Sequence, residues 1–253
     1  MKMTEKIEKK TVEEPPTGVV SGTFNKENWR PKTELGADVK AGKIKDISEI
    51  VGEGIRFLEP QIVDMLVPNV ESTLLSIGQS KGKFGGGKKS IWRQTQKKTK
   101  EGNKPNFGCL AAVGNKNGYV GIGFGKSKET MPSREKALRN AKLGLMNVRR
   151  GCGSWECGCK NPHSIPFKVK GKCSSVEIEL IPAPLGTGLC IEEECKKILE
   201  LAGIKDVYSR AVNSKNRLNL VYACFDALKK LSRTKISEED VKNLGILRGI
   251  KNE

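Results

Sequence analysis

The sequence predicts an α+β fold with two small domains, and three observations support this. Two apolar runs flank Asn117-Gly118 within segment 107–125, which is the strongest short signal for a β-hairpin. Segments 165–170 and 176–182 alternate apolar and polar residues, as half-buried strands do. Amphipathic helical stretches follow the strands in each half. Strands that pair around two helices in each half indicate two α+β domains.

We expect four parts along the 253 residues. They are an extended N-terminal arm (1–47), a first domain (48–150), a Cys/His-rich connector (151–164) and a second domain (165–253). The arm mixes charged residues with Pro15-Pro16 and lacks sustained periodicity, so we expect it to become ordered only against a partner.

The first domain is expected to begin with helices. A helical stretch starts near Ser48, and Pro60 must begin or break a helix, which favours two short helices. A longer helix follows the hairpin, with Ser133 as its N-cap. One face of this helix should carry an apolar stripe of Leu138, Ala141, Leu145 and Val148.

The second domain should continue from its two strands into helices. One is expected near 191–202, ended by Gly203, and another near 217–231. Ser237 with Asp240 is typical of the cap of a last short helix.

Positive charge dominates the chain and is concentrated in its first half. The formal net charge is +17, which usually persists because a polyanion partner neutralises it. Residues 81–100 carry eight Lys/Arg and no acidic residue, whereas 176–206 carry seven acids against three lysines. With its glycines, segment 81–106 is expected to form a pair of flexible basic loops. The alternative is a solvated loop without a nucleic-acid partner.

We therefore expect binding of structured RNA through phosphate contacts. Only 5% of residues are aromatic, which favours phosphate and shape recognition over base stacking. The candidate residues are Lys81, Lys83, Lys88, Lys89, Arg93, Lys97, Lys98, Lys100, Lys104, Lys126, Lys128, Arg134, Arg149, Arg150, Lys168 and Lys170.

Three glycines form a second candidate feature. Gly121, Gly123 and Gly125 alternate along the second strand of the hairpin, so one face of that strand has no side chains. Such a face suits close approach by a backbone or by RNA.

The sequence CGSWECGCKNPH places Cys152, Cys157, Cys159 and His163 within twelve residues. Zinc takes four thiolate or imidazole ligands in a tetrahedron, and Gly-containing spacers let one strand fold around it. Structural zinc is the leading interpretation, with Cys173 as a substitute ligand and reduced unliganded thiols as the main alternative. Redox or catalytic use is the least supported, because no orienting third group is evident.

The remaining features exclude several classes. The N-terminus lacks the apolar core of a signal peptide, and no segment approaches the ~20 apolar residues that span a bilayer. We expect a cytoplasmic protein with no membrane contact and with reduced or metal-bound cysteines. Cys109, Cys190, Cys195 and Cys224 lie in apolar contexts and are expected in the core.

Several long motifs also match a known family in the correct order. They are QKKTKEGNKPNFGCLAAVGNKNGYVGIGFGKSKE, KLGLMNVRRG, PHSIPFKVKGKCSSVEIELIPAPLGTG and LELAGIKDVYS. Over about residues 29 to 232 the chain resembles the ribosomal protein S-five family of the small subunit, in its archaeal and eukaryotic form. The segment KGKFGGGKKSIWRQ departs from the family as an insertion, so strand placement before Gln96 stays open.

The resemblance implies a fold and a function. The first domain would be like a double-stranded-RNA-binding domain, and the second would contain a left-handed βαβ crossover. The protein would bind small-subunit rRNA in the ribosome, near the channel through which messenger RNA enters. It would contact the neighbouring S-four protein and influence decoding accuracy. The family's basic hairpin loop maps onto Lys97, Lys98, Thr99, Lys100, Gly102 and Lys104.

Two other functional classes are less compatible with the sequence. The loop from Pro182 to Gly188 precedes a helix and could cradle a phosphate in an enzyme, but it lacks the Gly-Lys-Ser/Thr ending of a nucleotide site. No constellation of acid and base supports catalysis, so we expect no catalytic residues. A free-standing RNA-binding regulator would more often carry aromatic residues for base stacking.

Overall fold

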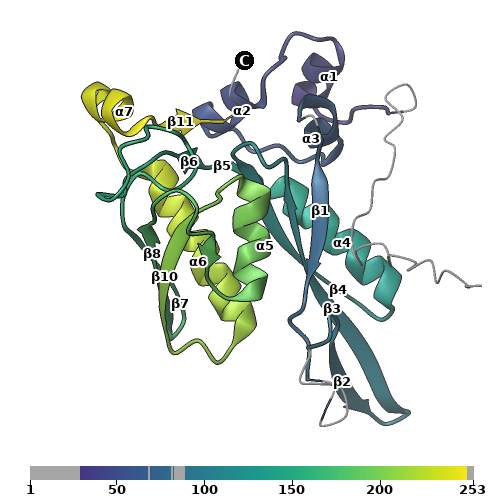
Figure 1. The fold of residues 1–253 in the computed structure, drawn as a ribbon. Helices are drawn as coiled ribbons and strands as arrows, with labels where there is room; N and C mark the ends of the chain where they lie inside the picture. The colour runs from purple at the N-terminus through teal and green to yellow at the C-terminus, as the bar shows by residue number, and fades with distance from the viewer. Residues whose placement is uncertain (1–28, 68, 81, 83–88, 250–253) are drawn as a thin grey trace, which may run out of the picture.

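The computed structural model describes residues 29–67, 69–80, 82 and 89–249 (Figure 1). The helices are Glu34–Lys40 (α1), Ile47–Glu53 (α2), Gln61–Leu66 (α3), Thr130–Leu143 (α4), Glu193–Ala202 (α5), Arg217–Arg233 (α6) and Glu238–Leu244 (α7). The strands are Glu71–Leu75 (β1), Arg93–Thr99 (β2), Gly102–Gly114 (β3), Tyr119–Ser127 (β4), Met146–Asn147 (β5), Arg149–Arg150 (β6), Val169–Cys173 (β7), Val176–Pro182 (β8), Leu189–Cys190 (β9), Val207–Val212 (β10) and Leu247–Arg248 (β11).

The first sheet is built on the long strand β3. The expected hairpin is confirmed, with β3 and β4 antiparallel around the turn that contains Asn117 and Gly118. Along its other edge, β3 pairs first with β2 and then with β1, so these two strands lie end to end. The prediction of flexible loops was wrong for residues 93–106, which mostly form strands β2 and β3.

The predicted insertion, residues 81–94, follows β1, and its last two residues, Arg93 and Gln94, begin β2. Its ends are held together because Gly78 N donates to Ser90 O at 2.7 Å and Ser90 N donates to Gln79 O at 3.0 Å. A Cβ at Gly78 would lie only 2.2 Å from Trp92 O, so glycine is required at this close approach. Residues 81 and 83–88 lie outside the described part.

The N-terminal helices cover one end of this sheet. The break at Pro60 is confirmed, because α2 and α3 lie on either side of it. Part of the expected arm is instead ordered by the chain itself, with α1 packed beside α3. Trp29 and Val39 join a buried cluster that includes Tyr119 of β4. The apolar residues of this segment are too few for visible periodicity, yet Trp29, Val39 and Ile47 are buried, and Leu35 and Ile44 are partly buried against them.

One carboxylate ties the start of the described chain to this cluster. Glu59 accepts hydrogen bonds from Trp29 Nε1 at 3.2 Å, Lys32 N at 2.8 Å, and both Thr33 N (2.7 Å) and Thr33 Oγ1 (2.9 Å). Burial opposes ionisation of Glu59, but the hydrogen bonds from Lys32 and Thr33 together outweigh it and lower its pKa. The segment before α1 is thus held by the chain's own side chain.

Helix α4 starts earlier than expected and covers one face of the first sheet. Its N-cap is Glu129, so the assignment of Ser133 as N-cap was wrong. Ser133 is buried within the helix and donates to Gly125 O at 3.0 Å. The helix ends at Leu143, which places Leu145 and Val148 of the expected stripe beyond it.

The second sheet has the order β7-β8-β10-β9 and is antiparallel except between β9 and β10. The unit β9-α5-β10 is a βαβ element whose parallel strands are neighbours. The first strand of this half begins at Val169 rather than 165. Helices α5 and α6 and the Ser237 cap confirm the expected elements, with Gly203 ending α5 in a left-handed conformation.

Helix α5 lies between the two sheets (Figure 1). Leu110, Ala112 and Ile122 of the first sheet belong to the same buried cluster as Ile198 of α5 and Leu228 of α6. The two halves therefore share one core, where separate cores were expected.

A two-stranded sheet closes the junction of the halves. Strand β11, near the end of the described chain, pairs with β6, so that Leu247 faces Arg150 and Arg248 faces Arg149. Among the helices of the described residues, none is both long and apolar enough to cross a membrane.

Candidate nucleic-acid interface and metal centre

The ribbon formed by β2 and the first half of β3 projects away from the rest of the molecule (Figure 1). All residues of β2 from Arg93 to Lys98 are exposed, and so are Gly102 to Pro105 in β3. A ribbon with almost no buried residue gains little from folding alone. Its exposed backbone and side chains are available to a partner.

The register sorts the predicted basic residues of the ribbon by face. Arg93 and Lys126 both lie beside Gly108 in one row across three strands, and Lys97 lies directly opposite Lys104. Because side chains alternate between faces, these four residues share one face. Like charges directly opposite each other repel and destabilise a free hairpin. Glu101 lies 3.0 Å from Lys104 and offsets part of this repulsion, so this face is charged for a polyanion at a small cost to local stability.

The other predicted RNA-binding residues are scattered. Lys98 lies on the opposite face of the ribbon, and Lys100 lies in its turn. Lys89, Lys128 and Arg134 are at least partly exposed, whereas Lys81, Lys83 and Lys88 lie outside the described residues. Lys168 and Lys170 lie 2.9 and 2.5 Å from Glu179, whose pKa falls to about 2 beside Lys170 and Lys168. Arg149 bonds to Thr234 O, and Arg150 is buried.

The glycine face is covered by the protein's own helix. A Cβ at Gly121 would lie 2.3 Å from Ala141 O, one at Gly123 2.1 Å from Ala141 N, and one at Gly125 2.1 Å from Ser133 O. Of the two neighbours that the sequence left open, backbone or RNA, the backbone of α4 occupies this face.

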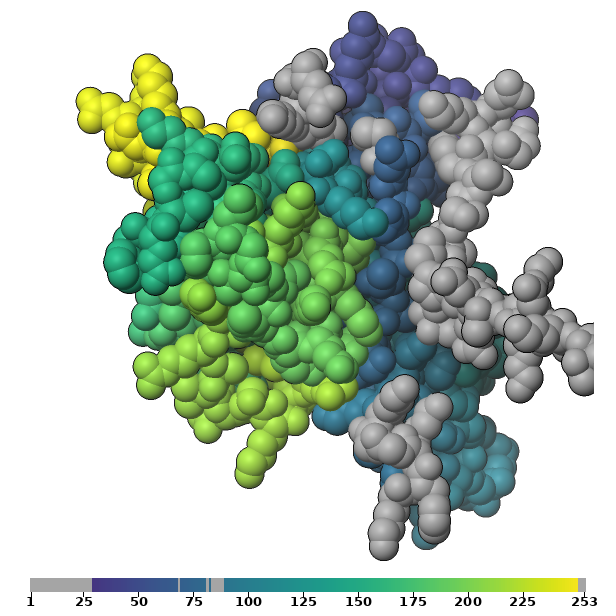
Figure 2. Space-filling model, in the orientation of Figure 1, coloured from purple at the N-terminus to yellow at the C-terminus, as the bar shows by residue number. Residues whose placement is uncertain are grey.

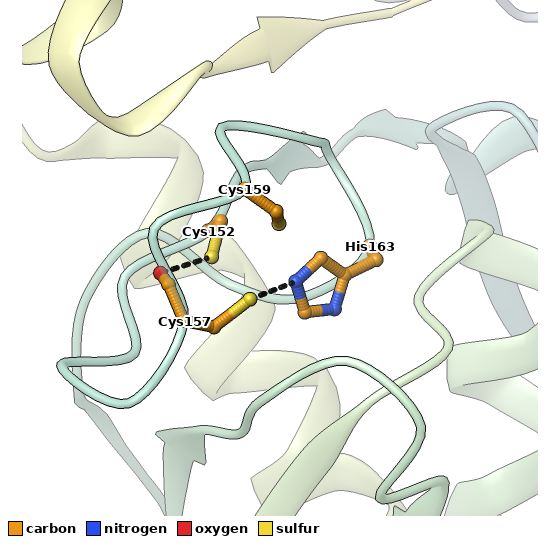
Figure 3. A group of neighbouring side chains, drawn as sticks. All are labelled: Cys152, Cys157, Cys159 and His163. Atoms are coloured by element: carbon orange, nitrogen blue, oxygen red, sulfur yellow. Dashed lines mark hydrogen bonds between the residues drawn. The ribbon is translucent and has the colours of Figure 1, made fainter.

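The four expected metal ligands converge on one point (Figure 3). The ligand atoms of Cys152, Cys157, Cys159 and His163 all lie within 4.8 Å of one another. Two thiolates bound to one zinc ion are roughly 3.8 Å apart, since each Zn–S bond is about 2.3 Å. Cys157 Sγ lies 3.9 Å from His163 Nε2. The donor set and its spacing therefore fit a tetrahedral ion with small adjustments.

The fold holds this cluster from two sides. Cys152 N donates to Leu244 O at the end of α7 at 2.9 Å, and Figure 2 shows the connector beside α7 at the surface. On the other side, His163 Nδ1 lies 2.7 Å from Asp206 Oδ2. A carboxylate on the far nitrogen of a histidine fixes the ring with Nε2 toward the cluster, as in many metal sites. Backbone N–H groups of Leu185 and Cys159 lower the pKa of the Cys157 thiol to about 6, which favours the thiolate.

The other cysteines are not part of the cluster. Cys173 lies at the end of β7, packed against the main core, and is absent from the group of converging ligands. Cys109, Cys195 and Cys224 are buried as expected. Cys190 is exposed on the short strand β9, so its assignment to the core was wrong.

Sequence comparisons identify the family. Residues 91–149 match "Ribosomal protein S5, N-terminal domain", and residues 171–241 match "Ribosomal protein S5, C-terminal domain". A "Small ribosomal subunit protein uS5" of Nanoarchaeum equitans is 48% identical over 226 residues, covering 89% of this chain and 97% of the relative. The chain belongs to the uS5 family. Proteins of the same name from Methanosphaera stadtmanae (47% identical, 88% of this chain and 92% of the relative) and Methanocaldococcus jannaschii (43%, 89% and 98%) are similar.

As a member of the uS5 family the chain is a non-enzymatic ribosomal protein. The loop weighed as an enzymatic phosphate cradle has a structural role. Asp206 Oδ1 accepts hydrogen bonds from Gly186 N at 3.2 Å and Gly188 N at 2.8 Å. These two N–H groups therefore donate to the carboxylate that orients His163 and do not form a phosphate site. Sequence reasoning missed Asp206, which stands 43 residues from His163 with no local motif around it.

Proposed function

We propose that the chain is a structural constituent of the small ribosomal subunit that binds small-subunit rRNA. The observation that carries this proposal is the projecting basic ribbon in a chain that aligns with 97% of a relative named for that subunit. By the family resemblance, the protein binds near the channel through which messenger RNA enters, contacts the neighbouring S-four type protein and supports decoding accuracy.

The RNA contacts are assigned first to the ribbon. Arg93, Lys97, Lys104 and Lys126 share one face, with Lys98 behind it and Lys100 at the turn. Repulsion between Lys97 and Lys104 is relieved when phosphate lies between them. Lys168 and Lys170 are weaker candidates, because Glu179 already neutralises part of their charge.

Salt-dependent binding tests this assignment. Each phosphate contact contributes about 0.7 to 0.9 to the slope of log affinity against log salt. Replacing Lys97, Lys98, Lys100 and Lys104 by Gln should reduce that slope by up to about three for small-subunit rRNA and release the protein from small subunits at raised salt. The melting temperature should not fall, because these side chains are exposed and the change removes the repulsion between Lys97 and Lys104. Retention of the wild-type slope would remove the ribbon from the RNA interface.

The proposed domain division is supported by where the family matches lie. Both matched ranges fall inside the proposed domains 48–150 and 165–253, on either side of the connector 151–164. The proposed arm is now limited to residues 1–28, which lie outside the described residues, since Trp29 to Thr33 and α1 pack with the first domain.

The Cys/His cluster is proposed to hold a structural zinc ion. When bound, zinc would cross-link the connector through Cys152, Cys157, Cys159 and His163. The connector has little apolar material of its own, and structural zinc contributes ~10 kcal/mol or more to folding small sites. One carboxylate oxygen of Asp206 then positions the ring of His163. The other accepts hydrogen bonds from Gly186 N and Gly188 N and so holds the loop that contains these glycines.

Elemental analysis and proteolysis test the metal. The wild type and the control Cys190→Ser, which changes an exposed cysteine outside the cluster, should carry about one zinc ion per chain. Cys159→Ser should lose the ion, and a chelator should expose 151–163 to protease in the wild type. Trp155 is 92% exposed, so proteolysis is a better reporter than its fluorescence. Zinc-free protein, or unchanged cleavage with chelator, would contradict the proposal.

A further inference from the structure

A cleft of about 810 Å³ lies where the two halves of the chain meet. The β3–β4 turn forms one wall, the end of α5 another, and the connector near His163 a third. Volumes in this range are typical of sites for small molecules or for a nucleotide-sized part of a larger ligand.

The walls of the cleft are fixed by backbone contacts. Lys116 N donates to Leu201 O at 2.8 Å, and Gly118 N donates to Ala202 O at 3.1 Å. Gly203, with φ +80°, ends α5 so close to the β3–β4 turn that a Cβ on this residue would lie 2.0 Å from Lys116 O. The cleft is therefore preformed and does not depend on a mobile loop.

Its side chains are mainly cationic. Lys116, Arg150, Lys196 and Lys205 line it against a single carboxylate, Glu200. Lys116 is paired with Glu71 at 2.6 Å, whereas no ion pair joins the other three cations to an acidic group within the described residues. Lys196 and Lys205 are exposed at the mouth of the cleft.

Arg150 is the decisive residue. It is only 6% exposed, and within the described residues its Nε has no hydrogen-bond partner. Nη2 donates to Gly249 O at 3.1 Å, and Nη1 lies beside Gly203 on the cleft wall. Burial lowers its pKa, yet arginine stays charged in proteins.

An unpaired buried charge needs compensation. Removing one ion from water is unfavourable even after the surroundings relax. The carboxyl end of α5 lies next to Arg150, but a helix end offsets only part of that cost. A bound anion would offset the rest of the cost of burying the charge of Arg150.

We propose that this cleft binds a phosphate group of RNA, with Arg150 at its floor and Lys196 and Lys205 at its mouth. The assignment rests on the proposed rRNA binding and adds a second contact, far in sequence from the ribbon. The charged guanidinium of Arg150 attracts phosphate through Nη1 at the cleft wall, and Asn117 and Asn161 add donors and acceptors for an adjoining ribose hydroxyl.

The test measures rRNA affinity against salt for three single variants of the full chain. Lys205→Gln and Arg150→Gln should each weaken binding roughly five- to eightfold at 0.1 M salt, relative to 1 M, and lower the slope by about 0.7 to 0.9. The matched control Lys215→Gln removes one exposed lysine in the turn between β10 and α6 and should change neither value. If Arg150→Gln melts early, Lys205→Gln decides alone, because its side chain is exposed.

Other probes separate the sources of the anion. Inorganic phosphate that raises the melting temperature of the wild type but not of Lys205→Gln, with unchanged rRNA slopes, would overturn RNA in favour of a free phosphate. Polyglutamate that binds the wild type but not Lys205→Gln, again with unchanged slopes, would overturn it in favour of an acidic protein segment. Wild-type slopes in both variants, with no effect of either probe, would overturn the site itself.

The ribbon variant, with Lys97, Lys98, Lys100 and Lys104 replaced by Gln, is measured in the same titration. It separates a failure of the cleft assignment from a failure of the proposed rRNA binding. If it loses affinity while Lys205→Gln does not, only the cleft assignment fails. If the wild type itself lacks salt-dependent rRNA binding, the proposed function fails.

Discussion

The β2–β3 ribbon and the glycine strand β4 belong to one sheet but differ in what covers them. The ribbon is exposed on both faces and carries lysines that repel each other. The glycines of β4 lie under the backbone of α4 at distances that admit no side chain. In sequence both looked like places where RNA comes close. Only the ribbon surface is open to a partner. A strand face without side chains can therefore indicate close packing within the protein, whereas excess positive charge indicates a surface for an anionic partner.

The largest expected effect comes from filling the glycine face. Gly123→Val should lower the free energy of unfolding by about 3 kcal/mol or more, because a rigid backbone, not a movable side chain, blocks the new atoms. Gly52→Val is the control, since a Cβ there meets nothing within 4 Å. Denaturant titration measures both. A Gly123→Val protein as stable as the wild type would mean that α4 does not seal this face.

Glu59 holds the segment before α1, which the sequence predicts to be ordered only against a partner. Glu59→Gln should destabilise the protein by about 1 to 3 kcal/mol at pH 7, because the amide accepts fewer of the hydrogen bonds that the carboxylate takes from Trp29, Lys32 and Thr33. Thermal or denaturant unfolding measures the loss. No change would indicate that the segment before α1 is held by burial of Trp29 alone.

The same carboxylate predicts a pH dependence with a definite sign. The pKa of Glu59 is lower in the folded state than its ordinary value of 4.5, so its contribution is fully present above that value. It is lost as the pH falls through the folded pKa. The stability difference between wild type and Glu59→Gln should therefore shrink below pH 4.5. A constant difference down to acid pH would contradict this role of the charge.

The smallest effect, on the ribbon, should have opposite signs for stability and binding. Lys97→Glu places an acid opposite Lys104 and should stabilise the free protein by about 0.2 to 1 kcal/mol. The same change should weaken rRNA binding, because it replaces a cation on the phosphate-facing side. Lys215→Glu serves as the control with an equal change of charge. Tighter binding by Lys97→Glu would place the RNA elsewhere.

Local signals in the sequence were sufficient for much of the fold and for the candidate metal ligands. The turn at Asn117-Gly118, the break at Pro60 and the cap at Ser237 depend on residues within a few positions of each other. The four candidate metal ligands could also be recognised, because they are close neighbours in sequence.

Features that depend on distant residues could not be predicted in this way. Strand β2, with sequence RQTQKKT, has no apolar residue and so no alternation from which to recognise a strand. Ser133 resembles an N-cap, but its hydroxyl is used by Gly125 O across the sheet. Asp206 and the cleft cations at Lys196 and Lys205 become neighbours of the connector only through tertiary folding.

The single core shared through α5 has a geometric consequence for recognition. Ser76 N of the first half donates to the buried Glu194 of α5 at 2.8 Å, and apolar residues of both sheets pack on that helix. The ribbon and the interdomain cleft are therefore carried by one rigid unit, at a set separation and angle. An RNA that contacts both must already hold its phosphates at that spacing, or deform to reach it. The protein would thereby select a particular tertiary shape of RNA, although neither contact reads a base.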